Sequence, residues 1–248
     1  MSAQTVTATP WEFRARAFVI FIAFGAGFFF GYLLQGLLFH DVTPSFVLIG
    51  QAWGTAGIEA CAYAAAALVV VAALLRAWAS SYHSPGVVMA AQVVTGTFTA
   101  AGPYRYVRNP LYLGNVLLSI GIGLLGPPVV TILVVILNLW FVYRLIAIEE
   151  RFLRASEGQA YEEYCRVVPR LMPRLGPAQL PADPRKPNVM RGVLTEFYML
   201  GFAAAMIYTA YSVTSGRHTN IGATFWVIAG SAVVAQMIIS SAVRSRAQ

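Results

Sequence analysis

The stretch GPYRYVRNPLYLG, residues 102–114, places polar side chains that can bind an anion directly before an apolar segment. Asn109 and Pro110 are typical of a helix start, because Asn is a favoured N-cap and proline at the first helical position loses no needed donor. A helix N-terminus presents unpaired N–H groups and a partial positive charge, which suits a carboxylate or a phosphate. Arg108 beside it adds a bidentate donor. The stretch therefore predicts an anion-binding pocket at a helix end.

Aromatic and glycine residues in the same stretch extend this prediction. Tyr104 and Tyr112 can line a slot for an adenine ring or a sulfonium cation, and Gly114 allows a ligand or another backbone to approach closely. A purely structural explanation also fits. Gly102 and Pro103 make a turn, the tyrosines lie where an aromatic belt forms, and the arginines set the membrane orientation. The residues alone leave both explanations open.

The composition assigns the whole chain to a membrane. Of its 248 residues, 58% are hydrophobic and 11% are charged, whereas a soluble domain usually carries about 25% charged residues. Spanning a bilayer core takes roughly 20 apolar residues of helix. Two runs meet this easily, 17–39 and 221–243, and four more qualify with less margin: 56–75, 110–126, 129–147 and 193–213. We therefore predict an all-α, polytopic membrane protein with about six transmembrane helices, built as a single membrane domain over residues 1–248.

The connections between these spans predict where chemistry can occur. Only Pro127 and Pro128 separate the third and fourth spans, so we expect a tight helical hairpin over about 110–147. Its geometry brings the polar regions 76–109 and 144–192 together, and any chemistry should lie where they meet.

Other segments have predicted roles as well. Residues 1–16 read as an N-terminal arm, 149–168 as a cytoplasmic interfacial helix, 169–188 as an irregular connection, and 193–243 as two additional transmembrane helices. In the first span, the spacing of Gly27 and Gly31 is typical of closely packed membrane helices.

The basic residues predict the orientation. With a cytoplasmic N-terminus and six alternating spans, 16 of the 17 Lys and Arg residues fall on the cytoplasmic side, and only Arg217 lies outside. Such a bias is the usual signature of cytoplasmic loops. We predict an integral multi-pass membrane protein with both termini in the cytoplasm. Topology and anionic lipid headgroups account for the net charge of +7, so we expect membrane lipids and no nucleic acid as partners.

Cysteine and histidine usage predicts neither a disulfide framework nor a metal centre. Cys61 falls in a span and Cys165 in a cytoplasmic stretch, while His40, His83 and His218 are widely separated. Such spacing does not match a zinc site, and we expect no bound metal.

Two separated motifs resemble one family of integral-membrane enzymes. VTGTFTAAGPYRYVRNPLYLGN (94–115), followed by RLIAIEERFLRASEGQAYEEYCRVVPRLMP (144–173), is similar to the isoprenylcysteine carboxyl methyltransferase/phospholipid methyltransferase family. The hallmark of that family is a Gly-x-Tyr-x-x-x-Arg-His/Asn-Pro-x-Tyr-x-Gly stretch that opens a helical hairpin. A Glu-Glu pair closes the hairpin, and a Tyr-x-x-Tyr segment follows. The resemblance covers roughly residues 70–175, which we take as a methyltransferase-like core.

The resemblance implies S-adenosylmethionine as cofactor, bound on the cytoplasmic side. The implied cofactor-binding residues are Gly102, Tyr104, Arg108, Asn109, Pro110, Tyr112, Gly114, Glu149 and Glu150, and the implied substrate-binding residues are Tyr161, Tyr164, Arg166 and Arg170. Asn109 stands where the eukaryotic isoprenylcysteine enzymes carry histidine. Because an amide cannot exchange a proton near neutral pH, a mechanism with a base at this position is disfavoured.

Within this set, Glu150 and Arg108 are the candidate catalytic residues. Glu150 is the carboxylate that we expect to orient the cofactor or an acceptor amine. Its structural alternative is an interfacial ion pair with Arg154 at i, i+4. Arg166 and Arg170 are candidates for holding an anionic headgroup, and their alternative role is surface charge.

The leading hypothesis is a methyltransferase that acts on a lipophilic or membrane-borne acceptor, such as a lipid amine or the carboxylate of an isoprenylcysteine-like group. Three alternatives stay open: an NAD(P)H-dependent membrane reductase of the sterol or steroid type, a small-thiol methyltransferase, and a non-catalytic membrane scaffold. Methyl transfer requires alignment and exclusion of water more than a protein nucleophile, and the sequence contains no evident nucleophile motif.

Overall fold

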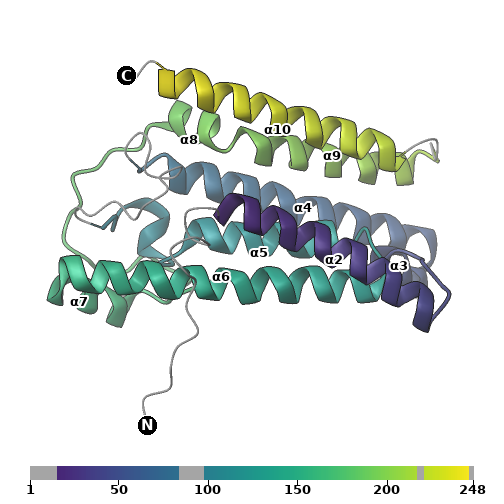
Figure 1. Ribbon diagram of the computed structural model, residues 1–248, viewed down its shortest axis with the longest axis horizontal. Coiled ribbons are helices and arrows are strands. Elements are labelled where there is room, and N and C mark those ends of the chain that lie inside the picture. Colours follow the sequence, from purple (N-terminus) through teal and green to yellow (C-terminus); the bar gives the residue numbers. More distant parts are fainter. Residues whose placement is uncertain (1–15, 84–97, 217–220, 246–248) are drawn as a thin grey trace, which may run out of the picture.

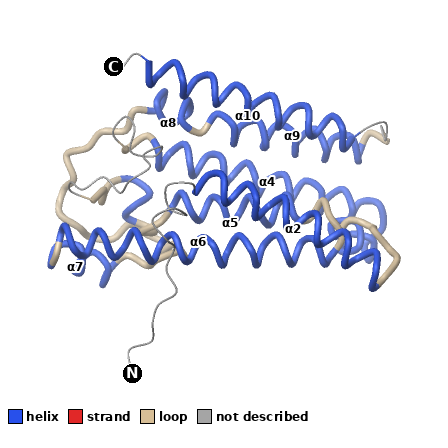
Figure 2. Tube along the Cα trace, in the orientation of Figure 1, coloured by secondary structure: helices blue, strands red, loops and turns tan. Residues whose placement is uncertain are grey.

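The computed structural model is a bundle of helices that run side by side (Figure 1), and it describes residues 16–83, 98–216 and 221–245. Within these residues the secondary structure is helical, with no strand (Figure 2). Most of the predicted N-terminal arm, together with Arg217 and His218, lies outside the described residues. The elements are α2 (Arg16–Leu38), α3 (Ser45–Gly50), η1 (Gln51–Trp53), α4 (Gly54–Ser80), η2 (Gly102–Arg105), α5 (Pro110–Gly123), α6 (Pro128–Glu157), α7 (Gln159–Val167), α8 (Val189–Thr195), α9 (Phe197–Thr214) and α10 (Ile221–Ser245).

The prediction of a polytopic helical membrane protein is confirmed. Five helical segments are long and apolar enough to cross a membrane: Phe18–Leu38, Ser45–Ser80, Pro128–Glu157, Phe197–Thr214 and Gly222–Ala242. The remaining predicted span, 110–126, corresponds to α5, a shorter apolar helix of 14 residues. Residues 124–127 connect α5 to α6 and complete the predicted hairpin, with Pro127 in an extended conformation and Pro128 as the first residue of α6.

Two predicted boundaries differ from the structure. The interfacial helix expected at 149–168 begins inside α6, because packing against the bundle buries Leu145, Ile146, Ile148 and Glu150 and carries the helix onward. The break lies at Gly158 instead, whose φ of 54° ends α6 and starts α7. The predicted span 193–213 is also interrupted, at Glu196 between α8 and α9.

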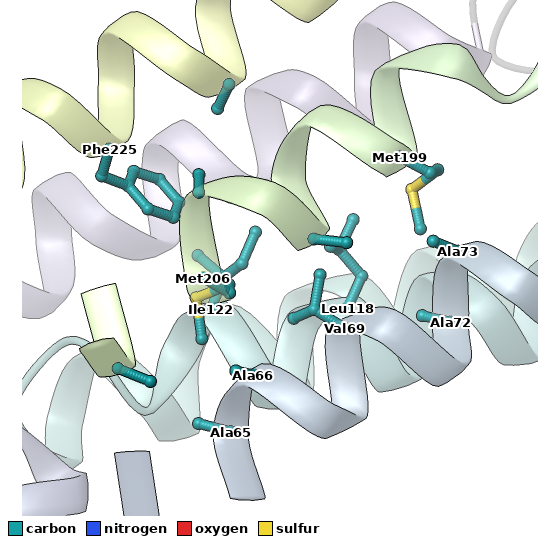
Figure 3. Packing of buried hydrophobic residues seen from close by; sticks show 14 of the residues in the cluster. Ala65, Ala66, Val69, Ala72, Ala73, Leu118, Ile122, Met199, Met206 and Phe225 are labelled. Carbon is teal, nitrogen blue, oxygen red and sulfur yellow. The ribbon is translucent and has the colours of Figure 1, made fainter. Parts of the chain in front are cut away.

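Small residues on α4 set the spacing at the centre of the bundle. Ala65, Ala66, Val69, Ala72 and Ala73 are buried at helical intervals, and such a stripe lets neighbouring helices approach closely. Figure 3 shows Leu118 and Ile122 of α5, Met199 and Met206 of α9, and Phe225 of α10 filling the space around this stripe. The central core therefore joins α4 to both α5 and the C-terminal pair α9–α10.

On the other side of the bundle, α2 packs against α6 through the glycine pair expected from the sequence. A Cβ added to Gly27 would lie 2.8 Å from Cγ2 of Val134, and one added to Gly31 would lie 2.7 Å from Cα of Val130. Larger residues at these positions would push the two helices apart.

The helix α5 is much shorter than α6, which continues past the first turn of α5. At 1.5 Å per residue its 14 residues span about 21 Å, whereas the 30 residues of α6 span about 45 Å. The connection after α7 crosses the N-terminal start of α5. Backbone N–H groups of Arg108, Arg174 and Ala178 donate to the carbonyls of Pro169, Tyr106 and Arg105, respectively.

Candidate functional site

The start of α5 and the end of α6 meet, as the hairpin geometry predicted. The Tyr112 hydroxyl donates to Glu149 Oε1 at 2.9 Å, and Arg16 at the start of α2 acts electrostatically on the same carboxylate. The two motifs read from the sequence therefore come into direct contact. They form a polar site at the end of the bundle where α2 begins, α10 ends, and α7 and α8 lie (Figure 1).

Asn109 occupies the predicted N-cap position but does not cap the helix with its side chain. Its Nδ2 instead donates to the backbone carbonyl of Arg170 at 3.0 Å. Pro110 is the first residue of α5, as predicted. The amide of Asn109 thus fastens the connection after α7 to the start of α5.

Glu150 is the most heavily paired carboxylate of the site. Its side chain is completely buried, and its oxygens lie 2.6 Å from Arg170 Nη2, 3.4 Å from Arg108 Nη2 and 3.4 Å from Arg154 Nη2. The pair with Arg154 is the i, i+4 alternative considered from the sequence. A carboxylate that is surrounded by three arginines fixes their positions, so Glu150 acts on the geometry of Arg108 and Arg170.

The tyrosines of α7 pack against the stretch before α5. Tyr161 and Tyr164 are buried, and their rings lie 5.3 and 4.9 Å from the ring of Phe98. The Tyr164 hydroxyl donates to the carbonyl of Tyr104 at 2.7 Å. Burial raises the pKa of Tyr104 well above its ordinary value, and Tyr164, Glu149 and Glu196 raise this pKa further. Tyr104 is therefore a neutral phenol that lies near the carboxylates of Glu149 and Glu196.

His83 lies directly against this tyrosine. Its Nε2 hydrogen-bonds the Tyr104 hydroxyl, and the two rings are 5.3 Å apart in an edge-to-face arrangement. Burial, and secondarily the charge of Arg185, lower the pKa of His83 to about 4. The imidazole is consequently neutral at physiological pH.

The two motif glycines allow close contacts that a side chain would block. Gly102 has a φ of 55°, and a Cβ added there would collide with the ring of Tyr82. A Cβ added to Gly114 would collide with Cγ of Arg76. The close approach expected at Gly114 is thus made by an arginine from α4.

Arg166 and Arg170, predicted together, lie in different surroundings. Arg166 is exposed on α7, whereas Arg170 pairs with Glu150 and also reaches a shallow groove on the exposed face of α6. The groove has a volume of about 510 Å³ and is lined by Ile136, Leu139, Trp140, Tyr143, Arg144, Ala147 and Arg170. Apart from the two arginines, the groove is apolar.

Sequence reasoning missed a second buried ion pair close to the site. Arg76 Nε lies 2.7 Å from Glu196 Oε2, and both side chains are almost fully buried. From the sequence, Arg76 is only one of the 16 basic residues assigned to the cytoplasmic side, and Glu196 lies inside an apolar run. A lone acidic residue within such a run was the available signal, because charges at membrane depth usually pair with one another.

The fold and site define a polytopic helical membrane protein with a cluster of buried polar and charged side chains at one end of its bundle. Residues 60–159 match the model of the phospholipid methyltransferase family. The resemblance drawn from the two motifs is thereby confirmed for the segment that holds the hairpin and the Glu149–Glu150 pair.

Two characterised relatives align with parts of the chain. The cobalt-zinc-cadmium resistance protein CzcN of Cupriavidus metallidurans is 36% identical over 80 residues, which is 32% of this chain and 37% of that protein. The methanethiol S-methyltransferase of Crocosphaera subtropica is 40% identical over 76 residues, 29% of this chain and 28% of that protein. The chain thus aligns with well under half the length of each relative. No solved structure matches it significantly.

Proposed function

We propose that this protein is an integral-membrane methyltransferase that uses S-adenosylmethionine. The observation that carries the proposal is the direct contact between the two halves of the family motif. Tyr112 of the first motif bonds Glu149 of the second at 2.9 Å, and Arg108 and Arg170 converge on Glu150. All but Arg170 lie within the segment that matches the phospholipid methyltransferase family.

The residues of the site fit the cofactor by their chemistry. Arg108 Nε is buried and has no hydrogen-bond partner among the described residues, so it can donate to a carboxylate. Glu149 can accept from an ammonium or a ribose hydroxyl, and Tyr104 and Tyr112 provide aromatic faces near these charges. We propose that Arg108, Glu149 and the two tyrosines bind the cofactor, and that Glu150 positions Arg108.

The cofactor supplies a methyl group whose bond to sulfur breaks as the bond to the acceptor atom forms, and S-adenosylhomocysteine leaves. The protein has to hold the two reactants in line and keep water away. The start of α5 suits this requirement, because the longer helix α6 continues past it and the connection after α7 crosses it. Among the described residues we assign no protein nucleophile to the reaction.

A lipophilic acceptor is the substrate class that we propose. The apolar groove lies on the exposed face of α6 and includes Arg144 and Arg170 in its lining, and Arg170 also contacts Glu150 at 2.6 Å. An acceptor with an apolar tail could lie along this groove and carry its head toward the site. Tyr161, Tyr164 and Arg166 stay proposed substrate-binding residues, of which the two tyrosines would shape the site from within the packing of α7.

A small thiol is the second candidate acceptor, and the similarity to a methanethiol S-methyltransferase favours it. The two acceptors leave different products, since a methylated lipid stays in the membrane and a methylated small thiol leaves it.

We place the site on the cytoplasmic side. Described cations lie in the elements that meet at this end of the bundle, including Arg105 of η2, Arg154 near the end of α6, Arg174 in the connection after α7 and Arg191 of α8. The cytoplasmic ends of membrane helices are enriched in such residues. A soluble cofactor would reach the candidate site from this side.

Calorimetry on the purified protein in detergent tests the proposal. We expect S-adenosylhomocysteine to bind at micromolar concentration and NADPH not to bind, because the site offers partners for an amino-acid carboxylate and ammonium. Glu149→Gln should weaken binding by about tenfold, the loss of one charge-assisted hydrogen bond. Glu163→Gln, an exposed carboxylate on α7, is the matched control and should bind like the wild type.

If only NADPH binds, the methyltransferase proposal is wrong and the protein is better explained as a reductase. If neither ligand binds, the result favours a non-catalytic scaffold. If S-adenosylhomocysteine binds, incubation with labelled S-adenosylmethionine in native lipids distinguishes the acceptors. Label in the lipid extract supports a lipophilic acceptor, and label in the volatile fraction after addition of methanethiol supports a thiol.

A further inference from the structure

We infer that the buried pair Arg76–Glu196 positions the first turn of α5. Through this pair, the C-terminal helices α9 and α10 take part in shaping the candidate site. Arg76 lies in the last turns of α4, and Glu196 lies at the junction of α8 and α9. The pair therefore joins the family-matched segment 60–159 to helices outside it.

The arginine connects three helices through separate donor atoms. Its Nε binds Glu196 Oε2 at 2.7 Å, while its Nη1 donates to the Leu111 carbonyl and to Asn115 Oδ1, both at 2.8 Å. Leu111 is the second residue of α5 and directly precedes Tyr112. Gly114 leaves room for the arginine to cross α5, since any side chain there would occupy the same space.

Glu196 is held just as completely. Its second oxygen accepts from Ser80 Oγ at 2.7 Å, and the ring of Tyr198 lies 5.8 Å below the Arg76 guanidinium. The network continues into the hairpin, where Asn138 Nδ2 donates to the carbonyl of Asn115 at 3.1 Å. A continuous polar path thus runs from α9 through α4 and α5 to α6.

A contribution to stability alone does not explain this arrangement. Removing two charges from water is expensive, and buried ion pairs can often be replaced by apolar residues of similar volume without loss of stability. The central core beside the pair is built from small apolar residues, so an apolar contact was available at this position. What an apolar contact cannot do is donate two hydrogen bonds to the first two turns of α5.

The site next to the pair depends on the placement of the first turn of α5. Tyr112 reaches Glu149 from it, and Arg108 and Asn109 precede it directly. A shift of α5 would move all three relative to α6, and small displacements of binding groups can cost large factors in activity. The functional part of this inference rests on the proposed function, whereas the positional part does not.

The double variant Arg76→Met/Glu196→Met removes both charges and keeps the approximate volume. Hydrogen exchange of the ligand-free protein in detergent is the first measurement. We expect exchange at residues 112–116 to rise by about tenfold while exchange at 130–140 of α6 stays unchanged, because Arg76 bonds α5 directly and neither residue of the pair bonds α6. Asn115→Ala removes one acceptor and leaves the ion pair intact, and it should give a smaller increase at the same residues.

Gln35→Met is the matched control. Gln35 is buried and ties α2 to the other end of the bundle, where it bonds the carbonyl of Asp41 and the N–H of Val129. This variant should lower the melting temperature without changing exchange at 112–116. Unchanged exchange there in both test variants would overturn the inference, as would an equal increase in Gln35→Met. If the double variant does not fold, Asn115→Ala decides the outcome.

The second measurement is the affinity for S-adenosylhomocysteine, which should fall by about tenfold in the double variant. If the wild type binds no S-adenosylhomocysteine, the proposed cofactor is wrong, and the exchange data still judge the role of the pair. Unchanged affinity together with faster exchange at 112–116 would overturn the link between this turn and the site.

Discussion

The two ends of the helix bundle are held together by different chemistry. At the end that holds the hairpin turn, Ser45 Oγ donates to the carbonyl of Gly126 at 2.9 Å, lies 2.7 Å from Thr131 Oγ1, and Gln35 joins α2 to α6. These contacts are all neutral. At the site end, buried charges do the joining, with Glu150 among three arginines and Arg76 against Glu196.

The neutral end demonstrates that helix ends of this bundle can be joined without ions. Hydrogen bonds between neutral groups contribute about 1 kcal/mol each, and they avoid the desolvation that buried charges require. The ions at the opposite end are therefore better explained by what they position than by what they stabilise. Substitutions that unsettle the two ends should differ in kind as well as in size.

The largest effect is expected from Glu150→Gln. The neutral amide would leave three arginine side chains around a fully buried position, and breaking a buried ion pair costs about 3–5 kcal/mol. Glu149→Gln is the matched variant. Its amide oxygen can still accept from the Tyr112 hydroxyl, so it should cost about 1 kcal/mol or less. Unfolding by sodium dodecyl sulfate in mixed micelles measures both free energies, and equal losses would contradict the division of roles between the two glutamates.

A smaller effect follows from acidification at the site end. The pKa of His83 is about 4 in the folded protein, against about 6.5 for a free imidazole. As the pH falls from 6.5 toward 4, the unfolded chain binds a proton that the folded protein does not bind, so the fold loses about 1.4 kcal/mol per pH unit in this window. The dependence fades above pH 6.5 and is almost gone at about pH 7.5, where the imidazole is neutral in both the unfolded and the folded state.

His83→Gln checks this prediction because glutamine can still bond the Tyr104 hydroxyl but does not titrate. The wild type should lose about 1.4 kcal/mol between pH 7.5 and 5.5 through this group, and the variant should lack this part of the decrease. Parallel pH profiles of the two proteins would mean that other groups cause the acid sensitivity.

The sequence predicted the elements of the site end better than their contacts. Continuous apolar runs predicted the spans, and Pro127–Pro128 predicted the hairpin, because both depend on local properties of the chain. The meeting of Tyr112 with Glu149 also followed, since a hairpin fixes which of its residues lie opposite one another. The spacing of Gly27 and Gly31 likewise predicted a close helix contact, though not the partner α6.

The sequence did not predict contacts between helices that are far apart along the chain. Arg76 and Glu196 are 120 residues apart, and their pairing depends on how α9 lies against α4. Asn109 was expected to cap α5, but the connection after α7 offered its amide the Arg170 carbonyl instead. In both cases a distant segment decided what a polar side chain binds, and local preference could not reveal it.

A small effect, comparable to that of Glu149→Gln, is expected from Ser45→Ala at the neutral end. The hydroxyl is buried and bonds Gly126 and Thr131, so its removal should cost about 1 kcal/mol. The loss stays small because the backbone N–H of Ser45 also donates to the Gly126 carbonyl, and Thr131 Oγ1 keeps its bond to the carbonyl of Gly123. Micelle unfolding measures the loss, and calorimetry with S-adenosylhomocysteine should give the wild-type affinity. A reduced affinity would mean that the two ends are coupled along α6. The neutral end would then also position the site, and the contrast between the two ends would be wrong.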